Sequence, residues 1–289
     1  IGAPDLFIQS RGNPLNPNMP SMSKGSQPTD GGNLLLSTEE REELIAHYPD
    51  AAAFIKRYMG SEEFINNKYR YCLWLKGIAP SEYRSITPIM ERLQEVAEVR
   101  SKSPTASVRK DAEKPMLFTQ IRQPESNYLA VPEVSSQRRK YIPIGYMTPE
   151  TIASSKLYLI PDASIYMFGV MMSNVHMAWM RVVCGRLKSD YSYSPAVYNN
   201  FPWPNPTETQ KEKIEQTAQS ILDARALYPS SSLADLYDEL TMPPELRTAH
   251  QRNDRAVMEA YGFWGKLNSE SECVAELMKM YQALTTSQA

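Results

Sequence analysis

The most regular hydrophobic pattern in this 289-residue chain is helical and lies in its second half. Residues 164–183 place apolar side chains three and four positions apart, which predicts one helix with a stripe that faces a protein core. The stripe consists of Ile165, Phe168, Met172, Val175, Trp179 and Val183. Residues 207–227 repeat the pattern, and shorter helical patterns follow at 233–240, 244–261 and 271–283. The chain therefore ends in a predicted helical tail.

The first sixty residues are less periodic. Residues 1–33 are rich in Pro, Gly, Asn and Ser, so we expect them to wrap a surface instead of folding alone. Ser37, followed by two glutamates, predicts the N-cap of a helix that ends near His47. A second helix is predicted at 51–59, with Gly60 as its C-terminal cap.

Between these regions, apolar spacing predicts a helix at 80–103, and short β-forming runs lie on both sides of it. Prolines separate several of the later runs, which suits short strands in a small, twisted sheet. The predicted strands are at 68–75, 116–121, 127–131, 140–146 and 156–160.

These patterns predict an α+β fold, in which a small mixed sheet with flanking helices precedes an all-α domain. The composition shifts after the prolines at 202 and 204, so we place the domain boundary there. The first domain is expected to span residues 1–205, with a wrapping segment and helices at 1–100 and a core at 101–205. Residues 206–289 are expected to form the helical domain.

Overall composition favours an ordinary globular protein, with 42% hydrophobic and 22% charged residues. No run approaches the 18 apolar residues of a membrane span, so no membrane partner is expected. The chain begins without Met or a basic and apolar leader, which favours a piece of a larger protein over a secreted one. Cys72, Cys184 and Cys273 lie far apart, which disfavours disulfides and structural zinc.

Charge is unevenly distributed although the net charge is only −2. Residues 101–145 carry eight Lys and Arg against four Asp and Glu, whereas residues 205–289 carry eight against thirteen. The densest positive run is Arg138, Arg139 and Lys140. A basic middle suits contacts with DNA phosphates, and a solvated loop would give the same count.

The stretch CGRLKSDYSYSPAVYNNFPWP at 184–204 combines charged and aromatic residues with three prolines. Arg186, Lys188, Asp190 and Ser192 lie two positions apart, so an extended backbone would direct them to one face. Two interpretations stay open at this point: a recognition surface, or a solvated edge strand with a surface charge pair.

Motifs for catalysis are missing from the sequence. An NPPY-type acceptor set, a GxSxG or HExxH motif and a clear nuclease pattern are all absent. The segment KGSQPTDGG lacks the spacing of a phosphate-binding loop. We therefore expect no catalytic activity and no cofactor in this chain.

Four blocks, in order, resemble MmeI-type restriction-modification enzymes. They are PSMSKGSQPTDGGNLLLS, GSEEFINNKYRYCLWL, GRLKSDYSYS with VYNNFPWP, and HQRNDRAVMEAYGF. Members of this family join a nuclease, an adenine-N6 methyltransferase and a DNA-reading domain in one chain. The resemblance implies a cytoplasmic, bacterial target-recognition domain, comparable to those of type I specificity subunits, with a C-terminal helical domain. It also implies S-adenosylmethionine in the parent enzyme, and double-stranded DNA and an upstream methyltransferase domain as partners.

The same resemblance implies roles for particular residues. Lys188 and Asp190 inherit base discrimination, and Ser192 stands where relatives often have Arg. A lysine can donate to guanine N7 and O6, and an aspartate can accept from cytosine N4. Glu133, Ser155 and Lys156 fall near further base contacts of the family, and the expected contacts to the DNA backbone are Arg138, Arg139, Lys140 and Arg186.

A non-catalytic module that binds another protein, with its charges solvated, is the alternative function. Clustering of the proposed base-reading residues and the basic loop on one concave, positive face would favour DNA, and dispersal would favour the protein partner.

Overall fold

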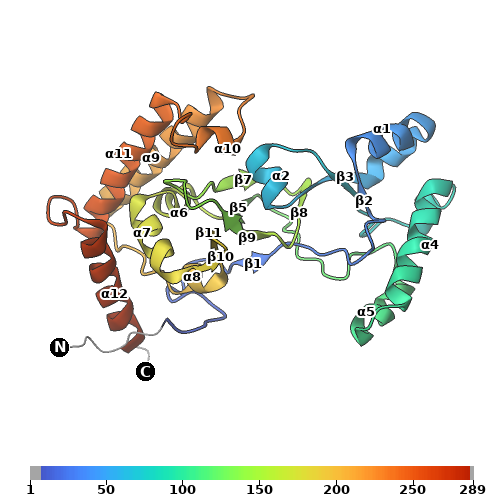
Figure 1. Ribbon diagram of the computed structural model, residues 1–289, viewed down its shortest axis with the longest axis horizontal. Helices are drawn as coiled ribbons and strands as arrows, with labels where there is room; N and C mark the ends of the chain where they lie inside the picture. The colour runs from blue at the N-terminus through green and yellow to red at the C-terminus, as the bar shows by residue number, and fades with distance from the viewer. Residues whose placement is uncertain (1–7, 287–289) are drawn as a thin grey trace.

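The computed structural model describes residues 8–286, and Figure 1 shows them as an elongated molecule. One end holds helices from the N-terminal third, and the other holds the C-terminal helices. Small sheets lie between them. The α+β fold with a helical C-terminal region is confirmed. Within the described residues the strands form three small sheets, where the sequence predicted one.

The central sheet is antiparallel throughout. Its strands, in spatial order, are β1 (Ser23–Lys24), β9 (Leu157–Pro161), β5 (Tyr128–Pro132) and β7 (Gly145–Met147). Every residue of β5 is buried, because helices cover one face of the sheet and a second apolar cluster covers the other. β1 shows that part of the proline-rich N-terminal region completes the sheet; residues 1–7 of that region lie outside the described residues.

A second, mixed sheet lies nearer the N-terminal helices. It contains β2 (Leu35–Leu36), β4 (Tyr71–Leu73), β3 (Ile55–Met59) and β8 (Thr151–Ala153). β3 pairs antiparallel with β4 and parallel with β8. The helix predicted at 51–59 is therefore wrong: a 3-10 turn (Pro49–Phe54) leads into a strand whose pairing on both sides overrides local helix propensity.

Two further predictions for this half need correction. Gly60 does not end a helix but precedes one, because it is the N-cap of α2 (Ser61–Asn66). The strand predicted at 116–121 is also wrong, since only Gln120 makes a bridge there, with Gln27.

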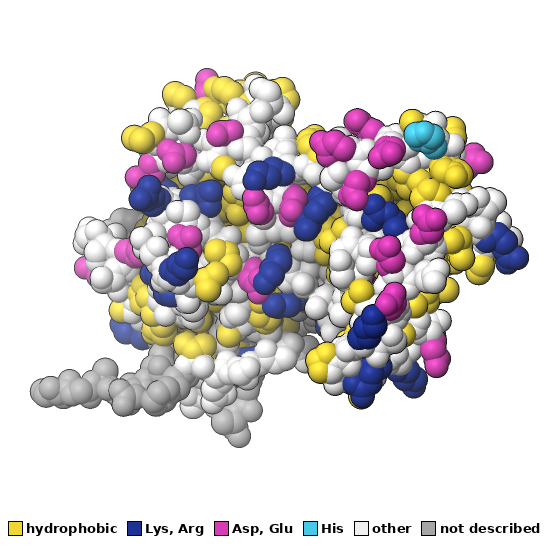
Figure 2. Space-filling model, turned by 45° about the vertical axis from the view of Figure 1, so that its right-hand side comes forward, with side chains coloured by type: hydrophobic (Ala, Val, Ile, Leu, Met, Phe, Trp, Pro, Cys, Tyr) yellow, Lys and Arg dark blue, Asp and Glu magenta, His cyan; other side chains and the backbone are white. Residues whose placement is uncertain are grey.

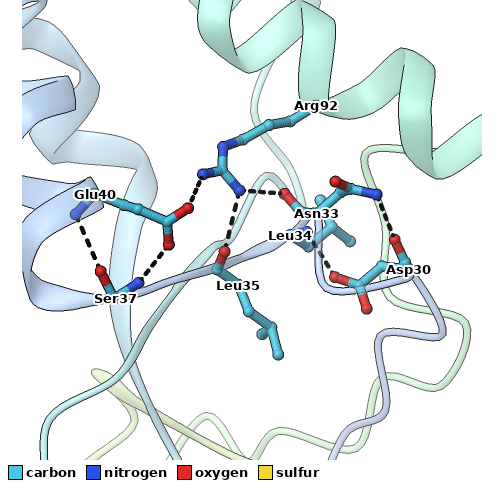
Figure 3. A network of polar contacts seen from close by, with 7 residues as sticks. All are labelled: Asp30, Asn33, Leu34, Leu35, Ser37, Glu40 and Arg92. Atoms are coloured by element: carbon cyan, nitrogen blue, oxygen red, sulfur yellow. Dashed lines mark hydrogen bonds and ion pairs between the residues drawn. The ribbon is translucent and has the colours of Figure 1, made fainter.

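Helix α1 (Thr38–His47) begins with the predicted Ser37 cap, whose side chain and that of Glu40 cap each other's backbone N–H. Arg92 lies on α4 (Thr87–Ser101) and reaches across to this cap (Figure 3). It donates to the carbonyls of Asn33 and Leu35 and pairs with Glu40 at 2.7 Å. One guanidinium thus ties α4 to β2 and α1.

The helix predicted at 80–103 is two helices, the short α3 (Pro80–Tyr83) and α4. After α4 come α5 (Ala106–Lys110) and a 3-10 turn (Asp111–Glu113). The helix predicted at 164–183 is likewise two helices, α6 (Ile165–Met171) and α7 (Asn174–Val183). Ser173 is buried between them and accepts from the N–H of His176, so it caps α7.

The C-terminal helices pack directly on α6 and α7. They are α9 (Glu208–Ala226), α10 (Leu233–Leu236), α11 (Pro244–Tyr261) and α12 (Glu270–Thr286). One apolar core runs from Leu129 in the sheet through Trp179 in α7 to Leu277 in α12. The chain at 201–207 has no regular secondary structure, but the core continues across it.

Candidate nucleic-acid interface

The charged stretch at 185–192 is a hairpin and not a single strand. β10 (Gly185–Leu187) pairs with β11 (Asp190–Ser192), and β11 also pairs with β6 (Val134–Ser135). Lys188 lies in the turn with φ of 57°, a left-handed conformation that reverses the chain direction. The prediction that its four polar residues share one face of a strand is therefore wrong.

Three of the predicted base-reading residues nevertheless meet at one open cleft of about 550 Å³. They are Glu133, which follows β5, Lys156, which precedes β9, and Ser192 on the hairpin. The rest of the lining comes from α2, from the chain before β4 and from neighbouring residues: Gly60, Ser61, Glu62, Glu63, Arg70, Val134 and Leu187.

Glu133 is the centre of the charge pattern in this cleft. Its side chain is 16% exposed, and its two oxygens pair with different lysines: Oε1 with Lys24 at 2.9 Å and Oε2 with Lys156 at 3.2 Å. Burial alone would raise the pKa of Glu133, but the hydrogen bonds from both lysines outweigh it, so the pKa lies below its usual value. The hydrogen bond from Lys24 raises the pKa of that lysine in turn. The cluster is therefore one carboxylate between two ammonium groups.

The backbone around Glu133 is held by three different parts of the chain. Its N–H donates to the carbonyl of Lys156 and to Ser61 Oγ, both at 3.1 Å. Its carbonyl accepts from the N–H of Tyr193 at 2.8 Å, and Ser61 Oγ also donates to the carbonyl of Lys156. The sheet, α2 and the hairpin are thus joined at the floor of the cleft.

Gly60 allows α2 to approach the cleft closely. A Cβ atom there would lie 2.9 Å from Ser154 Oγ and 3.0 Å from Glu63 Oε2, closer than such contacts normally occur. It would also lie 3.4 Å from Lys156 Cβ. A side chain at this position would require the side chains of Ser154 and Glu63 to shift.

A second depression, of about 330 Å³, adjoins the first and contains two more of the predicted residues, Arg139 and Asp190. Asp190 Oδ1 accepts from the N–H of Gln137 at 3.2 Å, and Arg139 donates to Ser135 Oγ at 3.4 Å. Burial lowers the pKa of Arg139, and the charge of Asp190 acts in the opposite direction. The two depressions share Ser61, Glu62 and Val134, so they form one continuous recess.

The remaining predicted residues lie around or away from this recess. Lys188 and Arg138 are exposed. Ser155 lies in the turn between β8 and β9, and its N–H donates to the carbonyl of Ser26. Arg186 stacks on the Tyr191 ring at 4.1 Å and donates to the carbonyl of Ser189.

The basic run at 138–140 does not act as one patch. Arg139 faces the recess, whereas Lys140 lies 5.7 Å from the ring of Tyr141. The carbonyl of Lys140 accepts from Arg181, which places this residue beside α7.

The surface is concave, but it is not uniformly positive. Glu62, Glu63 and Glu133 line the recess with Lys156 and Arg70. Figure 2 shows basic and acidic side chains interspersed across the face in view. The single positive face that would have favoured DNA over a protein partner is therefore not found: the recess has mixed charge, with both donors and acceptors, and Lys188, Arg138 and Lys140 do not line it.

Sequence patterns carry little signal for the part of the recess that comes from residues 1–100. Lys24, Ser61 and Arg70 belong to segments that were expected to wrap or pack, and only folding brings them beside Glu133. Among residues 8–286, no group of three or more His, Cys, Asp or Glu side chains could hold a metal ion. None of the described helices is long and apolar enough to cross a membrane.

Comparison with known proteins gives the family. DNA methyltransferase A of Bacillus subtilis (strain 168) is 38% identical over 282 residues, which are 97% of this chain and 32% of that protein. A structure of the type IIL restriction-modification enzyme MmeI in complex with DNA is 44% identical, with a TM-score of 0.94 over 98% of this chain and 38% of that one. The chain thus spans about a third of the length of these relatives. The model of the MmeI target recognition domain matches residues 2–205, and that of the MmeI C-terminal domain matches residues 206–288. The chain belongs to the MmeI family, as its target recognition and C-terminal domains.

Proposed function

We propose that this chain recognises the DNA target of a restriction-modification enzyme and directs an adenine-N6 methyltransferase to it. The observation that carries the proposal is the convergence of Glu133, Lys156 and Ser192 on one cleft, with Asp190 and Arg139 in the adjoining depression. This fold matches that of MmeI, whose structure is a complex with DNA.

The chemistry of the recess suits the edges of base pairs. In the major groove, guanine presents two acceptors, cytosine an amino donor, and adenine one of each. Ammonium and hydroxyl groups from Lys156 and Ser192 can donate, and carboxylates such as Asp190 can accept. A recess with both kinds of group can distinguish bases, whereas a uniformly positive surface would mainly bind phosphates.

The hairpin is a suitable element for reaching into a groove. Its turn carries Lys188, and its second strand is anchored to β6 and to the backbone of Gln137. We assign base reading to Lys188, Asp190, Ser192, Ser155 and Lys156, with Glu133 contributing to it through its ion pair with Lys156. We assign backbone contacts to Arg138, Arg139, Lys140 and Arg186.

Catalysis belongs to other parts of the longer relatives in this proposal. The chain has no NPPY-type motif, so binding of S-adenosylmethionine and methyl transfer take place outside residues 1–289. The same proposal includes contact between this chain and an upstream methyltransferase domain, a domain boundary at about residue 205 and a cytoplasmic location.

Duplex binding by the chain tests the proposal. A library of randomised duplexes, followed by fluorescence-anisotropy titration of the selected sequence, should show a sequence preference. Affinity should fall roughly tenfold or more between about 50 and about 200 mM salt, because bound phosphates release counterions. Calorimetry with S-adenosylmethionine should show no binding. Salt-independent binding, or no preference among duplexes, would support the protein-interaction alternative.

A further inference from the structure

Both oxygens of the Glu133 carboxylate already have cationic partners. Oε1 is paired with Lys24, and Oε2 is paired with Lys156. Lys24 comes from β1, more than a hundred residues earlier in the chain, and its ammonium also lies 5.6 Å from the centroid of the Tyr158 ring. One carboxylate between two ammonium groups leaves the cluster with a net positive charge, which disfavours the approach of a base amino group to Glu133.

The three side chains differ in how far they reach solvent. Glu133 is 16% exposed, Lys24 is 43% exposed and Lys156 is 70% exposed. An ammonium group has three N–H donors, so Lys156 can hold Glu133 with one and offer the others to a base edge. The group best exposed to meet a base is therefore Lys156, and the more buried Glu133 fixes its position through their ion pair.

The order of strands in the central sheet places Lys24 next to Glu133 and Lys156. β1, β9 and β5 are adjacent, and Lys24, Lys156 and Glu133 lie at one end of these strands. Without Lys24, Glu133 Oε1 would lose its ion pair in a partly buried site and would need another donor. An amino group of cytosine or adenine could then supply it.

We propose that Lys24 is a positioning residue for base selection. By pairing with Glu133, it leaves Lys156 as the group that reads the base, so that the site selects a base edge with hydrogen-bond acceptors. This inference rests on the proposed DNA recognition and adds a specificity-determining residue from the N-terminal strand β1. At this position the base is then read by the Lys156 ammonium, which donates to a base acceptor. Glu133 alone would indicate the opposite, a carboxylate that accepts from a base amino group.

The test is a comparison of base preference among variants of the chain. Lys24→Met should shift the preference at one base pair by about tenfold, from guanine toward cytosine or adenine at the base that Lys156 faces. Lys24→Arg should retain the original preference. Lys24→Gln is a second neutral variant, and circular dichroism checks that each variant is folded.

Lys68→Met is the matched control. Lys68 pairs with Glu62, which lines the same cleft, so this variant also removes one positive charge from the same face. It should weaken binding at low salt without changing which base is preferred.

The possible outcomes separate this inference from the proposed function. If the wild-type chain shows no sequence preference, DNA recognition fails and the role of Lys24 falls with it. If the wild type is selective but the neutral Lys24 variants retain its preference, the role of Lys24 alone is refuted. An equal shift in the Lys68 variant would also refute it, since charge loss would then be the cause.

Discussion

At the residue scale, Lys188 occupies a backbone conformation that is unfavourable for any residue with a Cβ atom. Its φ is 57°, and an L-residue there costs about 1–2 kcal/mol relative to right-handed conformations. Glycine would avoid that cost but would lose about 0.5–1 kcal/mol through the entropy of the unfolded chain. Turn geometry therefore favours glycine or is neutral, and a lysine side chain at this position fits a role in binding.

Lys188→Gly should separate stability from recognition. We expect the free energy of unfolding, measured with urea, to stay the same or rise by up to about 1.5 kcal/mol, because the relief of the left-handed backbone equals or exceeds the entropic cost of glycine. The preference among duplexes should fall at one base pair. Unchanged selectivity in this variant would show that the Lys188 side chain is merely solvated.

Asp254 on α11 is an unusual carboxyl group, because burial raises its pKa to about 6. Tyr141 donates to its Oδ2 at 2.5 Å, and the N–H of Asn174 donates to Oδ1 at 2.9 Å. These hydrogen bonds and the charge of Lys140 lower the pKa but do not outweigh burial. The folded chain therefore holds this proton at pH values where the unfolded chain has released it.

This difference in pKa predicts how stability depends on pH. Because the folded pKa is raised, the stabilising effect of the proton is complete below about pH 4 and is lost as the pH rises through about 6. The stability of wild type minus that of Asp254→Asn should fall by roughly 2–3 kcal/mol across this window. Urea unfolding at several pH values measures it, and a flat difference would contradict the buried proton.

At the element scale, α6 and α9 pack closely at Gly169. A Cβ atom on Gly169 would lie 2.8 Å from Ile214 Cγ2 and 2.9 Å from Ala218 Cβ. These are contacts with the body of α9, so the helices would have to separate. Asn253 on α11 donates to the Gly169 carbonyl at 2.7 Å, which holds a third helix in the same place.

Gly169→Ala should be destabilising even though it improves helix propensity. Alanine gains about 1 kcal/mol over glycine inside a helix, whereas overpacking costs about 1–3 kcal/mol. We expect a net loss of up to about 2 kcal/mol in urea unfolding. Gly12→Ala is the control, since a Cβ there would meet nothing within 4 Å. A more stable Gly169→Ala variant would show that α9 can move at little cost.

The elements that local signals define were predicted well. Ser37 caps α1, the extent of α11 matches the predicted 244–261, and α9 ends near its predicted position. The errors fall where tertiary contacts decide. Residues 55–59 form a strand because neighbours on both sides pair with them, and the long helix at 164–183 breaks because Ser173 caps a second one.

The candidate site was predicted only in part, for a related reason. Family resemblance gave Glu133, Lys156 and Ser192, which the structure brings together. It could not give Lys24, because the ion pair with Glu133 depends on a register between strands far apart in sequence. The alternation of polar side chains at 186–192 also did not reveal the two-residue turn at Lys188, because that turn depends on a left-handed backbone.

At the scale of the whole molecule, the recess and the C-terminal helices are joined through one core and one polar seam. Arg225 on α9 donates to the carbonyl of Ile144 at 2.7 Å and to the hydroxyl of Tyr237 at 2.9 Å. Tyr237 also bonds to His250 at 2.8 Å, and His250 stacks on Tyr141. Tyr141 directly follows the basic run, so the helices brace the chain that forms the second depression.

Removal of residues 207–289 should therefore abolish folding of the recognition part. Several large apolar side chains of the C-terminal helices are fully buried, and at about 1.5–3 kcal/mol each they contribute roughly 7–15 kcal/mol. They are Ile214, Ile221, Leu246, Val257 and Leu277, all 0% exposed. Their sum is comparable to the whole stability of a typical domain, about 5–15 kcal/mol. The truncated chain would expose the outer faces of α6 and α7, so we expect aggregation.

Size-exclusion chromatography and tryptophan fluorescence during urea unfolding measure this outcome. Trp179 is a suitable reporter, because it is buried and its ring lies 5.9 Å from that of Tyr281 on α12. In the full chain the tryptophan emission, to which Trp74, Trp203 and Trp264 also contribute, should shift cooperatively. In the truncated chain the emission should already lie nearer that of solvent-exposed tryptophan without denaturant. A soluble truncated chain that unfolds cooperatively and binds the same duplex with unchanged affinity would show that the two parts are independent, and that the acidic helices do not support the recess.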